Sequence, residues 1–127
     1  MVEFDNRLKS LLDEVDHYIE DLYAGMYSLN PVRPLRGETP NPEADGLFGI
    51  SADFTPGFAS ELGRGYLINV RMSTLDKVEQ HIREEIYELA VEKVKELLPL
   101  RFPERELVVR RDKKHFKIQG DFSLGDI

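Results

Sequence analysis

The chain has 127 residues, of which 41% are hydrophobic and 32% are charged, and its formal net charge is −7 at pH 7. This length accommodates one domain, residues 1–127, with a modest core, and the hydrophobic fraction is that of an ordinary globular protein. The absence of cysteine excludes disulfides and thiolate metal sites, and no apolar run is long enough to span a membrane.

The N-terminus carries Glu3 and Asp5 where a signal peptide would have basic residues and an apolar run, so we expect a cytoplasmic protein. Residues 3–28 predict an amphipathic helix, because apolar residues recur at spacings of three and four. Its expected inner side consists of Phe4, Leu8, Leu11, Leu12, Val15, Ile19, Leu22 and Met26. Its expected outer side is acidic and consists of Asp13, Asp16, Glu20 and Asp21.

Residues 29–46 hold four of the seven prolines and predict a connecting loop with extended pieces, which we expect to be tethered or partly disordered. Two segments with alternating character follow, at 47–54 and 66–72. A period of two predicts half-buried strands with one side toward the core and one toward water. The expected inward residues are Phe48, Ile50, Ala52, Phe54, Tyr66, Ile68, Val70 and Met72.

A second helix is predicted over residues 73–98, with Ser73 or Thr74 as its cap and Pro99 as its stop. Its apolar stripe consists of Leu75, Val78, Ile82, Ile86, Leu89, Val94 and Leu97. The opposite side carries Glu84, Glu88, Glu92 and Glu96, which we interpret as a solvated face.

Two more strands are predicted at 106–111 and 115–122, close enough in sequence to form an antiparallel hairpin. The first of them is apolar on both sides in its middle, which favours a central or partner-covered position. The α-β-β-α-β-β order predicts an α+β two-layer sandwich, in which two helices cover one face of a four-stranded, mainly antiparallel sheet. The other face of the sheet is then open.

Polar residues of the predicted strands should share that open face. They are Asp53, Asn69, Arg71, Lys117, Gln119 and Asp121. Such a cluster can bind a small polar or anionic ligand or a peptide, although any half-exposed sheet carries polar residues on its wet side. Catalysis is the weaker interpretation, because no nucleophile motif occurs and no predicted strand carries an acidic residue two positions before a lysine.

Positive charge is concentrated late in the chain, since residues 101–117 hold seven Lys or Arg against three acidic residues. Arg110, Arg111, Lys113 and Lys114 form a candidate basic interaction patch. Nucleic-acid binding there is disfavoured, because Phe116 is expected to point inward and the chain is acidic as a whole. Contact with an acidic protein surface is at least as well supported.

These patterns favour a non-enzymatic protein-interaction module, or one that associates with itself through the sheet or the C-terminal hairpin. The alternatives are a ligand-binding protein that uses the open sheet face and a nucleic-acid-binding protein that uses the basic hairpin. We expect no cofactor and no metal, because Glu14 and His17 lack the second such pair that a helical metal site needs.

Overall fold

The computed structural model describes residues 2–23, 25–26, 38, 46–56, 63–72, 77–112 and 114–120. The elements in chain order are α1 (Val2–Tyr23), β1 (Phe48–Thr55), β2 (Gly65–Met72), α2 (Gln80–Arg101), β3 (Leu107–Asp112) and β4 (His115–Gly120). This order confirms the predicted α+β fold. Most of the proline-rich loop expected at 29–46 lies outside the described residues.

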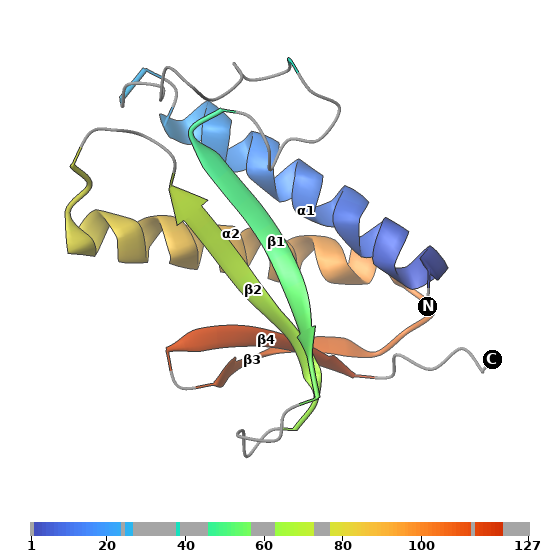
Figure 1. The fold of residues 1–127 in the computed structure, drawn as a ribbon. Helices are drawn as coiled ribbons and strands as arrows, with labels where there is room; N and C mark the ends of the chain where they lie inside the picture. Colours follow the sequence, from blue (N-terminus) through green and yellow to red (C-terminus); the bar gives the residue numbers. More distant parts are fainter. Residues whose placement is uncertain are drawn as a thin grey trace.

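The four strands form one antiparallel sheet in the order β1-β2-β4-β3 (Figure 1). Within each hairpin the pairing is continuous, from Phe48↔Met72 to Thr55↔Gly65 and from Leu107↔Gly120 to Asp112↔His115. Between the hairpins, β2 and β4 pair only at Tyr66↔Ile118 and Leu67↔Lys117. The two hairpins therefore cross at one end of β2 and diverge from there (Figure 1).

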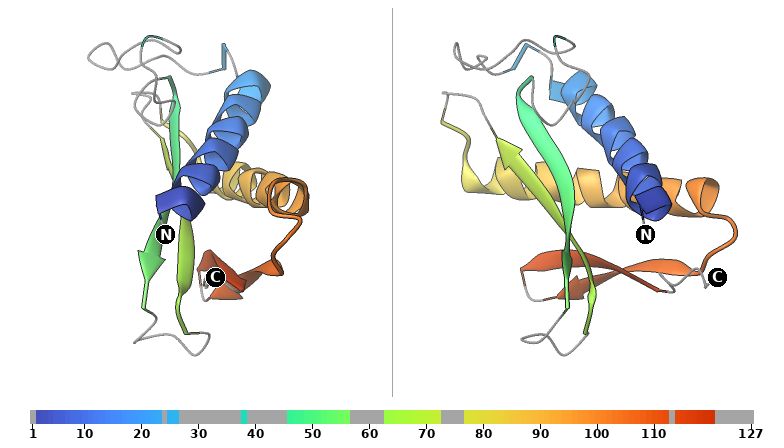
Figure 2. Two further views of the ribbon diagram at one scale, coloured as in Figure 1. Left: turned by 90° about the vertical axis from the view of Figure 1, so that its right-hand side faces the viewer. Right: turned by 45° about the vertical axis from the view of Figure 1, so that its right-hand side comes forward.

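Both helices lie on the same side of the sheet, which gives the predicted two layers (Figure 2). The core lies between the layers and combines the apolar stripes of the helices with the inward rows of the strands. Its largest fully buried apolar side chains are Phe4, Leu11, Val15, Ile19, Phe48, Ile50, Ile68, Ile86, Val91, Phe102 and Ile118. The alternation that predicted the inward rows is thus confirmed for the middle of the sheet.

Helix α1 differs from the prediction at its end and on its acidic side. It ends at Tyr23, and Gly25 adopts φ +81°, a left-handed conformation that interrupts helical geometry. Leu22, in the last turn of the helix, and Met26, beyond its end, were expected inside and are 47% and 61% exposed.

Two of the acidic residues expected to face water are buried instead, with Asp16 only 1% and Glu20 only 3% exposed. The Glu20 carboxylate accepts the backbone N–H groups of Leu47 and Phe48, at 2.8 and 2.9 Å from Oε2. Buried backbone donors need such partners, so Glu20 anchors the start of β1 rather than solvating α1.

Helix α2 begins at Gln80 with Glu79 as the N-cap residue, so the predicted start and caps at Ser73 or Thr74 are wrong. Pro99 lies inside the last turn, and the helix continues to Arg101. Burial of Leu98 and Phe102 holds this turn in place, since tertiary packing outweighs the local cost of a proline. The face carrying Glu84, Glu88, Glu92 and Glu96 is exposed, as predicted.

Two predictions about the strands are also wrong. The central position considered for residues 106–111 is wrong, because β3 lies at the edge of the sheet, whereas the partner-covered alternative stays a prediction; Val108 is 44% exposed. Phe54, near the end of β1, is 52% exposed although its ring packs against that of Tyr66.

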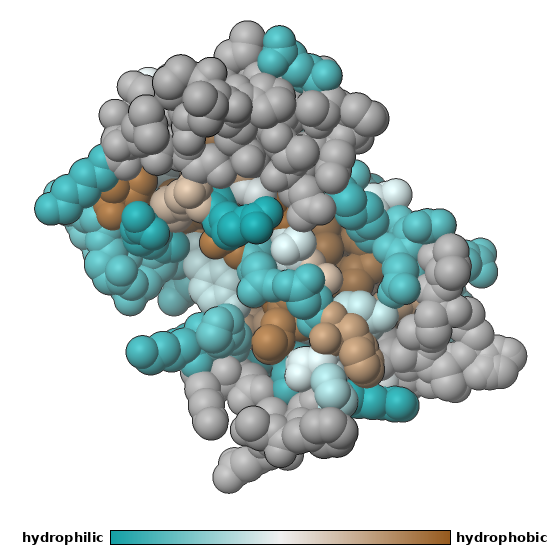
Figure 3. Space-filling view, in the orientation of Figure 1, coloured by the Kyte–Doolittle hydropathy of each residue, from teal (hydrophilic) through white to brown (hydrophobic). Residues whose placement is uncertain are grey.

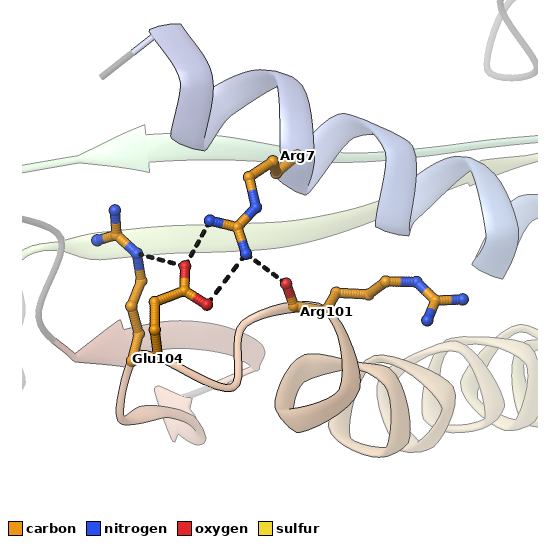
Figure 4. A network of polar contacts seen from close by, with 4 residues as sticks. Arg7, Arg101 and Glu104 are labelled. Carbon is orange, nitrogen blue, oxygen red and sulfur yellow. Dashed lines mark hydrogen bonds and ion pairs between the residues drawn. The ribbon is translucent and has the colours of Figure 1, made fainter.

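A polar clamp joins α1 to the end of α2 and to the turn before β3 (Figure 4). The Arg7 guanidinium donates to both carboxylate oxygens of Glu104, at 2.5 and 3.2 Å, and to the carbonyl of Arg101 at 2.5 Å. The same guanidinium lies 4.4 Å from the ring centroid of Phe102, which is buried. Hydrogen bonding from Arg7 is the main reason that the pKa of Glu104 falls to about 2.

Because this pKa is below its ordinary value, the ionised Glu104 contributes stability that is fully present above about pH 4.5 and is lost as the pH falls toward 2. We therefore expect Glu104→Gln to lower the urea midpoint at pH 7 and the difference from wild type to narrow between pH 4.5 and 3. The side chain is about half exposed, so added salt should reduce the difference. Glu88→Gln, on the exposed face of α2, is the charge-matched control. A difference for Glu104→Gln that stays constant from pH 7 to 3 would contradict the assignment.

Candidate functional site

The divergence of the hairpins leaves a hollow of about 460 Å³ between β2 and the start of β4, which we call the notch. Its lining consists of Ser51, Asp53, Ile68, Asn69, Val70, Arg71, Tyr87, Lys114 and His115. The space-filling view shows this side of the molecule hollowed between the β1–β2 hairpin and the β3–β4 hairpin, with hydrophilic atoms on both rims (Figure 3). The notch therefore opens directly to solvent.

Tyr87 belongs to α2, and its side chain lines the notch at the point where β2 and β4 separate. Its hydroxyl donates to the carbonyl of Ile68 on β2 at 3.0 Å and accepts the N–H of Phe116 on β4 at 2.8 Å. Burial is the main cause that raises the pKa of Tyr87, so the hydroxyl keeps the proton it donates. One side chain thus replaces the backbone ladder at the point where the two strands separate.

Beyond Tyr87, one edge of β2 has no neighbouring strand in the described part of the chain. The Ile68 carbonyl points away from β1 to Tyr87, and the Phe48 N–H points away from β2 to Glu20. Ile68↔Ala52, Val70↔Ile50 and Met72↔Phe48 are every second pair of the β1–β2 ladder. Their backbone groups therefore point in the same direction relative to the partner strand. Alternation along an antiparallel strand therefore directs the backbone N–H and C=O groups of Val70 and Met72 away from β1, toward the side on which the notch lies.

Three of the predicted site residues meet on the open face beside this edge. Asn69 donates from Nδ2 to the Asp53 carboxylate at 2.6 Å, across the β1–β2 pair. Arg71 follows on the same side of β2 and is exposed. This part of the predicted cluster exists as a group of adjacent side chains.

Lys117 and Gln119 lie elsewhere, over the turn that leads into β2. Lys117 is 1% exposed and donates from Nζ to the carbonyl of Gly63 at 2.6 Å, so the expectation that it faces water is wrong. Gln119 donates to the carbonyl of Arg64 at 3.0 Å. Gly65 makes room for the lysine, because a Cβ there would lie 2.6 Å from Lys117 Cγ. Asp121 lies outside the described residues.

The basic patch predicted from the sequence is only partly beside the notch. Arg110 and Arg111 are exposed on β3, Lys114 is exposed at the start of β4, and Lys113 lies outside the described residues. The Arg111 guanidinium lies 5.2 Å from the ring centroid of Phe116, which is half-buried on the helix side as predicted.

His115 is a notch residue that sequence analysis missed. It is exposed beside Lys114, at the point where β4 begins. Its strand position was predicted, but its place near Arg71 depends on how the hairpins cross, and no periodic pattern carries that information.

A second groove of about 520 Å³ runs between α1 and the outer edge of β1. The side chains of Leu8, Leu12 and Phe54 give it an apolar wall. The hydroxyl of Tyr66 crosses its floor to donate to Asp5 at 2.7 Å, and burial followed by this bond raises the pKa of Tyr66.

No group of three His, Asp or Glu side chains among the described residues is arranged to hold a metal ion. No helix in the described ranges is long and apolar enough to cross a membrane.

We expect Tyr87→Phe to lower the free energy of unfolding by about 1–3 kcal/mol, because the Phe116 N–H and the Ile68 carbonyl both lose their partner. Urea denaturation followed by circular dichroism measures this. Tyr18→Phe is the matched control, since Tyr18 is also half-buried and its hydroxyl makes no hydrogen bond to the described residues. We expect its effect to stay within about 0.5 kcal/mol. Equal losses for the two variants would show that the Tyr87 hydroxyl does not hold the strands.

We expect Gly65→Ala to destabilise the protein by about 1–3 kcal/mol, because its Cβ would meet the Lys117 stem and the Ile118 carbonyl at 2.6 and 2.7 Å. Adding Lys117→Ala removes the first of these contacts. The double variant should therefore lose less stability than the sum of the two single variants, measured in the same urea titrations. Strict additivity would contradict the packing of Lys117 over Gly65.

Comparison with known proteins places the chain in a family. A family model described as "Uncharacterised protein" matches residues 1–120. A relative from Borreliella burgdorferi, described as "Uncharacterized protein", is 36% identical over 120 residues, which is 94% of this chain and 94% of the relative. No solved structure matches the chain. The match covers both helices and all four strands, so the chain belongs to this family of uncharacterised proteins.

Proposed function

We propose that the protein is a non-enzymatic interaction module, which binds an extended segment of a partner as an added strand beside β2. The observation that carries this proposal is the edge of β2 from Ile68 to Met72, which has no neighbouring strand in the described residues and borders the notch from Ile68 to Arg71.

An exposed strand edge is a template for pairing, because its backbone N–H and C=O groups accept a further strand in register. Five residues at about 3.3 Å each give roughly 16 Å of edge, the length of a short strand. The notch supplies the space for such a segment, and Tyr87 closes one end of it. Main-chain bonds would then provide affinity, and the side chains lining the notch would provide selectivity.

The polar residues beside the edge support this function better than catalysis. The Asp53 carboxylate accepts from Asn69, and Lys117 is buried against the carbonyl of Gly63. These contacts hold neighbouring strands and turns together rather than converging on one reacting atom. The notch is also open along the face seen in Figure 3, whereas small-molecule sites enclose most of their ligand.

The added strand can be supplied by another protein or by a second copy of this chain. In the second case, the two β2 edges would pair antiparallel across a two-fold axis, as in a closed dimer. Light scattering over a concentration series separates the two sources, because only a second copy makes the mass depend on protein concentration.

The test uses a capped heptapeptide of alternating serine and valine, titrated into labelled protein and followed by amide NMR. We expect shifts at the amides of Val70 and Met72, because these groups would bond the peptide. The same peptide N-methylated at alternate residues should not bind, since it lacks donors on one edge. Shifts located elsewhere, or equal binding of the N-methylated peptide, would overturn the proposal.

Val70→Pro removes the N–H that faces the notch and should abolish peptide binding. The fold should persist, because proline is tolerated where a strand N–H is not used by the sheet. Ala52→Pro is the matched control. The Ala52 N–H also points away from the neighbouring strand of the hairpin, but it lies on the outer edge of β1, on the side opposite the notch. This control should bind the peptide as wild type does, and loss of binding in both variants would contradict the location.

A further inference from the structure

Two positively charged side chains, Arg71 and Lys114, line the notch from the two hairpins, and the imidazole of His115 lies beside Lys114. Arg71 lies on β2, Lys114 lies in the turn just before β4, and His115 is the first residue of β4. All three are exposed, and no carboxylate of the described residues forms an ion pair with Arg71 or Lys114. The acidic residue of the lining, Asp53, already accepts a hydrogen bond from Asn69 at 2.6 Å. The notch therefore offers cationic groups that lack an anionic partner within the described chain.

The two sides of β2 differ in chemistry along the free edge. Asn69 and Arg71 point to the open face, whereas Ile68 and Val70 point toward the helices and the ring of Tyr87. Side chains of an added strand alternate in the same way, because neighbouring strands share their pleat. Every second side chain of the bound segment would thus lie beside Arg71, and the others beside Val70 and Tyr87.

We infer that the segment bound at the notch carries acidic and apolar residues in alternation. Its carboxylates would lie on the open face against Arg71, Lys114 and His115, and its apolar side chains would face the helix layer. This inference rests on the proposed strand addition and names the chemistry of the partner. Charge complementarity of this kind selects among strands that could all form the same backbone bonds.

A nucleic acid is the competing anion, and the surroundings of the notch disfavour it. The adjoining groove between α2 and the β3–β4 hairpin carries two carboxylates, Glu84 and Glu88, among its three cations, Arg83, Arg111 and Lys114. The chain as a whole has a net charge of −7, which repels a long polyanion. The ring of Phe116 packs against Tyr87 at 5.5 Å between centroids and is only half-exposed for stacking. These three features disfavour a long polyanion more than a short acidic strand, which contacts the notch alone.

The experiment compares three fluorescein-labelled heptapeptides of alternating sequence, Glu-Val, Ser-Val and Lys-Val, by fluorescence anisotropy at low salt. We expect the Glu-Val peptide to bind about tenfold more tightly than Ser-Val, and Lys-Val to bind more weakly than both. Raising the salt to about 0.3 M should bring the Glu-Val and Ser-Val affinities together, since the Debye length shortens to roughly 6 Å.

Arg71→Gln and Lys114→Gln should each weaken Glu-Val binding by about twofold to fivefold and leave Ser-Val binding unchanged. Arg110→Gln is the matched control, because Arg110 is exposed on β3 and does not line the notch. An equal loss for Arg110→Gln would show a general charge effect and overturn the assignment to the notch.

The outcomes separate the inference from the function on which it rests. Equal binding of Glu-Val and Ser-Val, lost in Val70→Pro, would retain strand addition and overturn the acidic preference. Binding of an N-methylated Glu-Val peptide with undiminished affinity would overturn strand addition itself, as would no binding of any peptide. Preferential binding of a labelled 20-residue oligothymidylate, weakened by Arg71→Gln, would replace the acidic peptide with a nucleic acid.

Discussion

The hydroxyl of Tyr87 is the interaction on which the shape of the sheet depends. Where two paired strands separate, each leaves backbone groups that need new partners, and burial makes that need costly. Tyr87 supplies one acceptor to β4 and one donor to β2 from a single oxygen atom. The strands can therefore part after two paired residues each, and the space between them becomes the notch rather than a continuation of the ladder.

The helix layer holds this divergence in place from behind. Helix α2 contacts both hairpins, through the bond of Tyr87 to β2 and its ring contact with Phe116 on β4. Helix α1 packs along β1 and fixes its start through the buried Glu20 carboxylate. The Arg7–Glu104 clamp then ties α1 to the turn that leads into β3 (Figure 4). Each hairpin is thus attached to the helices independently of the other hairpin. These attachments are needed because β2 and β4 share only two residue pairs.

Periodicity predicted the parts of this structure that a single element decides, and it failed where distant segments meet. Ile50, Ile68 and Ile118 turn inward together, as alternation along the strands predicted, and the element order with the apolar stripes of the helices predicted the two layers. Glu20 was placed in water because its partners, the N–H groups at the start of β1, are 27 and 28 positions away. Lys117 was placed on the wet side because its burial depends on the missing side chain of Gly65 in another strand. His115 joins the notch only through the crossing of the hairpins, which no local pattern specifies.

The positive charges beside the free edge of β2 have two consequences for how that edge pairs. Cationic side chains beside an edge discourage it from pairing with neutral or like-charged strands, which is one way that proteins limit edge-to-edge aggregation. Arg71 and Lys114 are placed to do this along β2, whereas the backbone donors at the start of β1 bond to Glu20. On the proposed function, this arrangement makes the β2 edge unattractive to most strands and receptive to one class. Selectivity then comes from the cost imposed on wrong partners as much as from the contacts offered to the right one.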